Sequence, residues 1–255
     1  MTYIDHHVHT SFSPDSMADI DEYINKAKLL GLEYILFTDH KDFGSIDPKF
    51  EFFIDYDEYF STLKELETKH NFPIKIGIEI GYETKLKNEI EEFLDKYDFD
   101  FIIASIHYGH GLNFYSKEFF EGRTKDEAYL DYFSLLLDMV ENFNHYDVVG
   151  HLDFIERYGP YDDKSYLYSD YKLIIDNILK AIIKNKKGIE VNTSGLRQGE
   201  DRTFPKYEVI KRYKELGGKI ITVGSDAHLN RDFQADVEKV VNKLKSIGFE
   251  PYQVE

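Results

Sequence analysis

The chain has 255 residues and a mass of 30.0 kDa, so it can bury a large core and has the usual size of one (β/α) barrel domain. Its formal net charge of -17 argues against a general nucleic-acid binder, because phosphate backbones attract a basic face. Since there is no cysteine, disulfides and thiolate metal sites are excluded, and any metal must be held by nitrogen and oxygen donors. The first residues lack a signal peptide and no apolar run approaches a membrane span, so we expect a cytoplasmic protein without a membrane partner.

Seven short β-branched runs alternate with seven amphipathic stretches. We predict strands at Tyr3–His7, Tyr34–Phe37, Ile74–Ile80, Phe101–Ile106, Val148–Gly150, Gly188–Val191 and Ile220–Val223. We predict helices at Ile20–Leu30, Tyr56–Lys69, Glu89–Lys96, Lys125–Phe143, Tyr171–Lys186, Pro205–Leu216 and Arg231–Ile247. This alternation is typical of parallel βα units and predicts an α/β fold: one domain over residues 1–255, a distorted seven-stranded (β/α)7 barrel like the TIM barrel. A doubly wound open sheet is the alternative.

Side chains able to bind metal recur at the ends of the predicted strands. The nine candidates are His7, His9, Asp15, His40, Glu79, His107, His151, Asp226 and His228. In a parallel barrel the carboxyl ends of all strands meet on one face, where the chemistry of such barrels lies. The pattern therefore favours a multi-metal hydrolase.

Two pairs of candidate ligands lie at opposite ends of the sequence. His7 and His9 alternate on an extended segment, so both imidazoles can reach one ion, whereas His6 should point away and pack. Asp226 and His228 repeat this spacing after the last strand, although Asp226 is also a good helix N-cap. Either pair alone is a weak signal, but the two together are a strong one.

Glu79 interrupts an otherwise apolar predicted strand. A carboxylate there is costly unless it is paired or binds a cation, so Glu79 is either a bridge between two metals or half of a buried ion pair. His40 follows Thr38 and Asp39, which predict either a helix cap or a ligand histidine oriented by a carboxylate. His107 and His151 each end a strand, and that shared position favours metal binding for both.

Two arginines follow loops at strand ends, Arg157 and Arg197. A planar guanidinium can hold two phosphate oxygens at once, while a surface ion pair is the alternative in so acidic a chain. The sequence has no P-loop, nucleophile elbow or dinucleotide-binding motif. Covalent serine catalysis and nucleotide cofactors therefore lose support.

These motifs resemble a known family. The segments DHHVHTSFSPDS, FTDH, GIEIGYE, SIHYGHG, VGHLDFIER, VNTSGLR and VGSDAH occur in the order found in the PHP (polymerase and histidinol phosphatase) superfamily, and most closely in its stand-alone histidinol-phosphatases. The resemblance covers essentially the whole chain and implies a trinuclear site holding two to three divalent ions, Zn, Fe or Mn. It implies three ligand groups: His7, His9, Glu79 and Asp226; the shared Glu79 with His107 and His151; and Asp15 with His40 and His228. Many members carry histidine where this chain has Asp15, and an oxygen donor would change the identity or occupancy of the third metal.

The resemblance also implies a reaction, the hydrolysis of L-histidinol phosphate to L-histidinol and phosphate in histidine biosynthesis. Two cations sharing Glu79 would lower the pKa of a bridging water, and the resulting hydroxide would attack phosphorus in line. Glu79 and Asp226 would be catalytic, His110 would be a candidate acid for the leaving group, and Arg157 and Arg197 would hold the phosphate. The loops around His110 and Tyr82 would contact the organic part of the substrate.

Other functions stay open at this point. A PHP-type phosphoesterase acting on another small phosphomonoester or on a phosphodiester, or a nuclease, would use the same metals, although the charge of -17 fits a nuclease poorly. A metal-binding protein without turnover is an alternative of another class. The sequence leaves the oligomeric state open between a monomer and a homodimer.

Overall fold

A parallel sheet, curled into a half-barrel, forms the centre of the computed structural model, which describes residues 3–45, 50, 54–197, 199 and 202–254. Its six strands lie side by side in chain order: β1 (Ile35–Asp42), β2 (Ile74–Gly81), β3 (Phe101–Ser105), β6 (Val148–Val149), β7 (Gly188–Asn192) and β8 (Ile221–Gly224). All neighbouring pairs are parallel. This architecture confirms the predicted barrel-like α/β fold.

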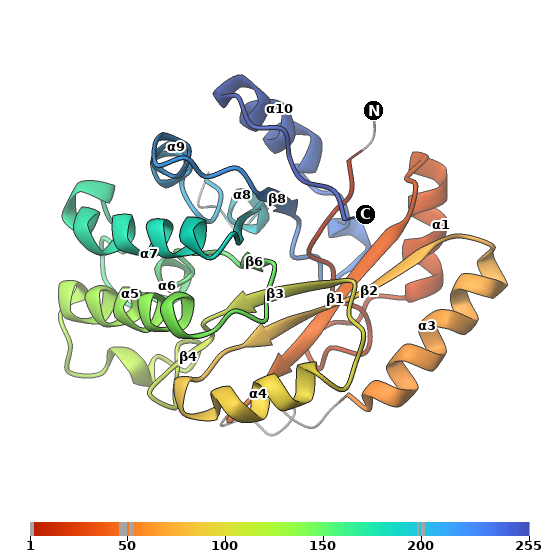
Figure 1. Cartoon of the computed structure of the whole chain (residues 1–255), viewed down its shortest axis with the longest axis horizontal. Coiled ribbons are helices and arrows are strands. Elements are labelled where there is room, and N and C mark those ends of the chain that lie inside the picture. The colour runs from red at the N-terminus through yellow and green to blue at the C-terminus, as the bar shows by residue number, and fades with distance from the viewer. Residues whose placement is uncertain (1–2, 46–49, 51–53, 198, 200–201, 255) are drawn as a thin grey trace.

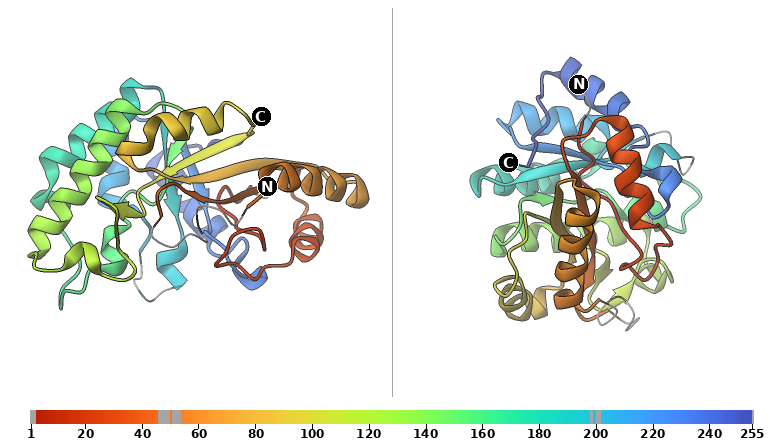
Figure 2. Two further views of the ribbon diagram at one scale, coloured as in Figure 1. Left: turned by 90° about the horizontal axis from the view of Figure 1, so that it is seen from below. Right: turned by 90° about the vertical axis from the view of Figure 1, so that its right-hand side faces the viewer.

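Helices cover the outer face of the sheet, as the views in Figures 1 and 2 show. The longer helices are α1 (Ile20–Leu30), α3 (Tyr56–His70), α4 (Lys87–Leu94), α5 (Lys125–Asn142), α7 (Lys172–Lys184), α9 (Tyr207–Glu215) and α10 (Val237–Ile247). The shorter ones are α6 (Ile155–Tyr158) and α8 (Ser194–Arg197), with 3₁₀ turns at Thr84–Leu86, Glu118–Phe120, Tyr168–Asp170 and Asn230–Asp232. No helix within the described ranges is long and apolar enough to cross a membrane.

The first predicted strand, Tyr3–His7, is not a regular strand. Within the described part of the chain, residues 3–9 make a single bridge, in which Val8 lies parallel to Ala227. The segment nevertheless fills the gap between the first and last strands: the His6 amide donates to the Val223 carbonyl of β8 (3.0 Å), and the Thr38 amide of β1 donates to the Val8 carbonyl (2.8 Å). An irregular segment therefore stands in place of the seventh strand of the predicted distorted barrel.

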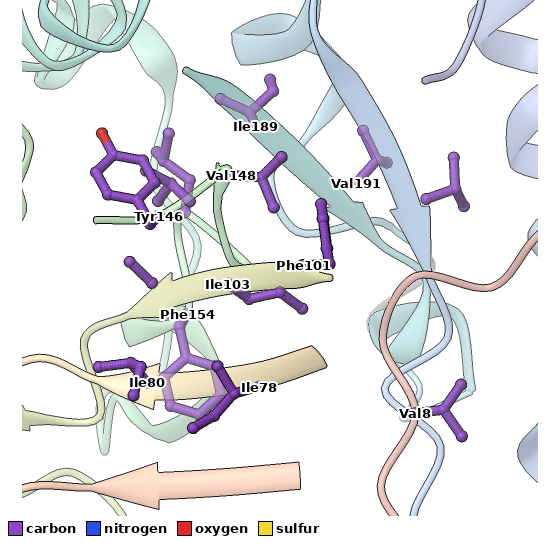
Figure 3. Close-up of a cluster of buried hydrophobic side chains, with 14 of the residues drawn as sticks. Val8, Ile78, Ile80, Phe101, Ile103, Tyr146, Val148, Phe154, Ile189 and Val191 are labelled. Carbon is purple, nitrogen blue, oxygen red and sulfur yellow. The ribbon is translucent and has the colours of Figure 1, made fainter. Parts of the chain in front are cut away.

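Buried apolar side chains lie on both faces of the sheet. The register places Ile103 and Val148 on the inner face, and Ile78 and Ile189 on the outer face beneath the helices. Figure 3 shows these four side chains, with Val8 beside the chain that follows β8. All five of these side chains are fully buried. Strands covered on both sides read as continuous apolar runs, so a polar residue inside one of them is informative.

Some elements differ in extent from the prediction. β1 runs to Asp42, so Thr38, Asp39 and His40 lie within the strand and no helix cap forms there. The last helix begins only at Val237, because Asp236 has a left-handed backbone (φ 58°) that interrupts the helix. A hairpin of β4 (Tyr108–Gly109) and β5 (Leu112–Asn113), which the sequence did not predict, follows β3 and places its loop at the carboxyl end of the sheet.

Candidate metal centre

The candidate ligands converge at the carboxyl ends of the strands. Glu79 lies near the end of β2, and His40 lies beside it in register on β1. His107 follows β3, His151 follows β6, and Asp226 and His228 follow β8. The irregular segment between β8 and β1 supplies His7 and His9. Residues from both ends of the chain thus meet at one rim.

Four donor atoms form the most enclosed group. His7 Nε2 and His9 Nε2 lie 3.2 Å and 3.6 Å from Glu79 Oε2, and 3.8 Å and 3.5 Å from Asp226 Oδ1. A tetrahedral zinc ion with ligands at 2.0–2.1 Å separates those ligands by about 3.3–3.4 Å. The spacing of these four donors therefore suits one such ion.

The other oxygen of Glu79 faces a second group. Its Oε1 lies 2.9 Å from His151 Nε2 and 3.3 Å from His107 Nε2, and these two nitrogens are 3.5 Å apart. Glu79 thus offers one carboxylate oxygen to each group. This is the geometry of a carboxylate that bridges two cations.

A third group is more open to solvent. Asp15 Oδ2 lies 3.2 Å from His228 Nε2 and 3.7 Å from His40 Nε2, and the Asp15 side chain is 40% exposed. The other ring nitrogen of His40, Nδ1, is 2.9 Å from Glu79 Oε2. The His9 ring stacks at 4.1 Å against both His40 and His228, so the third group adjoins the first.

The electrostatics of Glu79 depend on these imidazoles. Complete burial of the carboxylate would raise its pKa, but His7, His107 and His40 outweigh burial and hold the pKa well below its ordinary value. Conversely, burial lowers the pKa of His40, whereas Glu79 and Asp15 raise it by more, to about 9. The site therefore holds a concentrated negative charge that attracts protons or cations.

Polar groups behind the ligands fix their orientation. His7 Nδ1 lies 2.6 Å from Glu190 Oε1, and His107 Nδ1 lies 2.9 Å from Asp42 Oδ1. A carboxylate that accepts a hydrogen bond from one ring nitrogen leaves the other nitrogen free for a metal. The Ser105 hydroxyl donates to Glu79 Oε1 at 2.7 Å and so fixes that carboxylate as well.

Several buried nitrogen and oxygen atoms at this point have no hydrogen-bond partner among the described residues. They are His7 Nε2, His9 Nε2, His40 Nδ1 and Glu79 Oε2. Buried polar atoms are rarely left unsatisfied, and here they all point toward each other. Three to four imidazole and carboxylate ligands at these spacings fit divalent ions such as zinc. Among the described residues, four overlapping sets of three side chains lie close enough together to hold an ion.

A cavity of about 430 Å³ opens onto the centre. Seven of the nine metal-binding candidates line it: Asp15, His40, Glu79, His107, His151, Asp226 and His228. The remaining wall is Asp42, Phe50, Tyr108, Asn113, Tyr115, Phe154, Arg157 and Tyr158. A volume of this size suits a small organic ligand.

The two arginines differ in position. Arg157 lines the cavity, where its guanidinium donates to Ser194 Oγ and, at 3.3 Å, to Asp226 Oδ2. Arg197 is not among the lining residues: it donates to the Ser225 carbonyl at 2.7 Å and lies 3.7 Å from Asp232. Its guanidinium faces the Ser225 and Asp226 carbonyls and braces the turn that carries Asp226, and its role in phosphate binding stays a prediction.

His110 also differs from its expected role. The β4–β5 turn gives it a left-handed backbone (φ 56°), and its Nε2 lies 3.1 Å from both oxygens of Asp131 on α5. It is absent from the cavity wall among the described residues, so a role as the acid has no geometric support. Tyr82 is likewise buried, against Phe143, and does not line the cavity.

Other expectations can be compared directly. His6 packs edge-on against Phe101 at 5.6 Å, away from the ligands, as expected. Asp39 does not orient His40: its oxygens accept hydrogen bonds from Thr10 and Ser13, and so hold the loop that carries Asp15.

Sequence reasoning missed several residues of the site. Glu190 interrupts the apolar strand β7 just as Glu79 interrupts β2, and this signal could have identified it. Asp42 has no such signal, because it became part of the site only when β1 extended beyond its predicted end. The aromatic wall formed by Tyr115, Phe154 and Tyr158 depends on how loops fold over the rim, which spacing does not reveal.

The geometry agrees with comparisons to known proteins. A family model of the PHP domain matches residues 5–194, which carry seven of the nine candidate ligands. The chain belongs to the PHP family.

Several of its relatives are histidinol-phosphatases. It is 36% identical to the histidinol-phosphatase of Lactococcus lactis subsp. lactis (strain IL1403), over 98% of this chain and 93% of that protein. It is 33% identical to a "probable histidinol-phosphatase" of Clostridium acetobutylicum, over 97% of this chain and 94% of that protein. The crystal structure of the L. lactis histidinol phosphate phosphatase, in complex with zinc, L-histidinol and phosphate, superimposes with a TM-score of 0.89 and covers 98% of this chain and 95% of that chain.

Proposed function

We propose that this protein is a metal-dependent phosphomonoesterase that hydrolyses L-histidinol phosphate to L-histidinol and inorganic phosphate. The observation that carries the proposal is the position of Glu79, with one oxygen in each of two donor groups, in a cavity that Arg157 also lines. The similarity to the L. lactis enzyme over nearly the whole length of both chains supports the choice of substrate.

The chain's own residues would hold two to three divalent ions, zinc, iron or manganese. His7, His9, Glu79 and Asp226 would hold the first, Glu79 with His107 and His151 the second, and Asp15 with His40 and His228 the third. Bound divalent ions supply Lewis-acid stabilisation of phosphoryl oxygens and lower the pKa of water to near neutrality. Glu79 and Asp226 would act by bringing these charges together, and no covalent phospho-enzyme is needed.

Arg157 would bind the phosphoryl group. Its guanidinium lies on the cavity wall, stacks 4.8 Å from the Phe154 ring, and is held by Ser194 and Asp226. An arginine fixed in this way presents donors to the phosphoryl oxygens, whose negative charge must be stabilised as the ester bond breaks.

The aromatic wall would receive the histidinol part of the substrate. Tyr115 is 77% exposed and lies edge-on to Tyr158 at 6.0 Å, and Tyr158 in turn contacts Phe154 at 5.1 Å. Aromatic faces bind flat rings and cationic amines, and histidinol has both an imidazole and an amino group. Tyr115 lies on the loop around His110, and Tyr108 and Asn113 of the same loop also line the cavity, which supports the expectation for that loop; Tyr82 is not among the lining residues.

Metal analysis coupled to phosphate release tests the proposal. The full chain, loaded separately with zinc, manganese or iron, should release phosphate from L-histidinol phosphate far faster than from other small monoesters or from a diester. Tyr115→Ala should reduce this preference, with a matched Leu130→Ala variant on the exposed face of α5 as control. Equal rates on all esters would contradict the substrate assignment, and no phosphate release by fully metallated protein would contradict the activity.

A further inference from the structure

Strand β7 carries a row of buried polar side chains that are not themselves among the candidate metal ligands. Glu190 and Asn192 alternate on the strand and therefore point to the same face, and Ser194 follows at the start of α8. Glu190 and Asn192 are fully buried and Ser194 is 1% exposed. Polar groups so deep in a barrel are costly unless each has a partner, so their partners indicate what they do.

Glu190 contacts ligands of both proposed metals that share Glu79. Its Oε1 lies 2.6 Å from His7 Nδ1, and its Oε2 accepts from the His151 backbone amide at 2.8 Å. A side chain at position 224 would collide with this carboxylate and with His7, so Gly224 on β8 provides the space that the contact needs. One carboxylate thus sets the positions of ligands on either side of Glu79.

The row continues from Glu190 to the phosphate-binding candidate. Asn192 Nδ2 donates to Glu190 Oε2 at 3.2 Å, and Asn192 Oδ1 accepts from the Ser194 hydroxyl at 2.5 Å. The Ser194 oxygen in turn accepts from the Arg157 guanidinium. Every donor in the row points the same way, from a cation at one end to an anion at the other, and such aligned hydrogen bonds strengthen one another.

We infer that Glu190, Asn192 and Ser194 are positioning residues that fix Arg157 relative to the metal ligands. The inference rests on the proposed role of Arg157 in phosphate binding. Without the Ser194 hydroxyl, the same guanidinium nitrogen would keep only Asp226 as a partner among the described residues, at 3.3 Å, and Arg157 would shift toward that metal ligand. The row would therefore keep the cation available to substrate and separate from Asp226.

Two measurements on the zinc-loaded full chain test the inference without turnover: the dissociation constant of inorganic phosphate and the affinity for zinc against a chromophoric chelator. Ser194→Ala should weaken phosphate binding about tenfold and leave zinc affinity unchanged, because it removes one hydrogen bond to a charged group. Glu190→Gln should lower zinc affinity about 10- to 100-fold, as the loss of a partner of a ligand histidine does. Thr222→Val is the matched control: Thr222 pairs with Glu190 in register on β8, yet its buried hydroxyl has no hydrogen-bond partner among the described residues.

A double-mutant comparison separates positioning from a general structural effect. In an Arg157→Gln background, Ser194→Ala should change phosphate affinity no further, since Ser194 acts through Arg157. Two results would overturn the inference, even if Glu190→Gln failed to fold. One is wild-type phosphate affinity in Ser194→Ala, and the other is a loss of about tenfold in phosphate affinity when Ser194→Ala is added to Arg157→Gln. If the wild type does not hydrolyse L-histidinol phosphate while these binding patterns hold, the proposed function fails and the positioning row stands.

Discussion

Replacing Glu79 with glutamine changes the charge shared by two donor groups without changing the shape of the side chain. The carboxylate has five imidazole nitrogens within 3.6 Å, so the substitution removes its negative charge from both groups at once. Glutamine keeps one side-chain oxygen and replaces the other by an NH2 group, so it cannot serve both groups as the carboxylate does. Apart from Glu79, the group with His107 and His151 has two protein donors, whereas the group with His7 and His9 has three. The group with His107 and His151 should therefore lose its ion first.

We expect Glu79→Gln to lose at least one equivalent of bound metal and to lower kcat by about a thousandfold or more, equivalent to about 4 kcal/mol of transition-state stabilisation. Elemental analysis after dialysis and phosphate release from L-histidinol phosphate measure the two effects on one preparation. Glu89→Gln, on the exposed face of α4, is the matched control and should behave as wild type. A Glu79→Gln protein with its full metal content and full turnover would refute the bridging role.

Three further predictions concern binding, pH and stability. Arg157→Gln should raise KM about 30-fold with metal content unchanged, since a hydrogen bond to a charged group contributes about 2 kcal/mol; an unchanged KM would exclude Arg157 from phosphate binding. Neighbouring carboxylates raise the pKa of His40 to about 9, so below that pH a cation must displace a proton from His40. Affinity for the third ion should therefore fall by up to about tenfold for each pH unit below 9. Calorimetry in buffers of different ionisation enthalpy should detect the released proton, and the absence of proton release would contradict the prediction. Ile178→Ala, at a buried position of α7, should lower the free energy of unfolding by about 2–5 kcal/mol in urea titrations. Leu173→Ala, at a position of the same helix that is 79% exposed, should lower it by less than about 0.5 kcal/mol. Equal losses would show that the packing of α7 is misassigned.

The sequence predicted the fold well because its main signal is local. Alternating apolar runs and amphipathic stretches specify parallel βα units, and all parallel strands end at one face, so strand-end residues such as His151 and Asp226 had to meet. The first strand failed for the opposite reason. Residues 3–9 lie between β8 and β1 through hydrogen bonds to Val223 and Thr38, and these partners lie far away in sequence.

Residues on loops were harder to place. Strand-end spacing shows that Arg197 and His110 lie near the rim, but it does not show which way each side chain turns. A left-handed residue in the β4–β5 turn directs His110 to Asp131, and the Ser225 carbonyl binds Arg197. Glu190 was missed although an isolated carboxylate in an apolar strand is a local signal, the same one that singled out Glu79.

Closure of the barrel by residues 5–9 determines when the centre can assemble. His7 and His9 leave the ribosome early, but the segment that carries them is fixed by bonds to β8 and to the turn after it. A nascent chain that has not yet reached β8 lacks both the strand that binds this segment and two of the ligands, Asp226 and His228. Cation loading is therefore a late event in biogenesis, and a chain that is cut short before β8 should emerge without a complete centre.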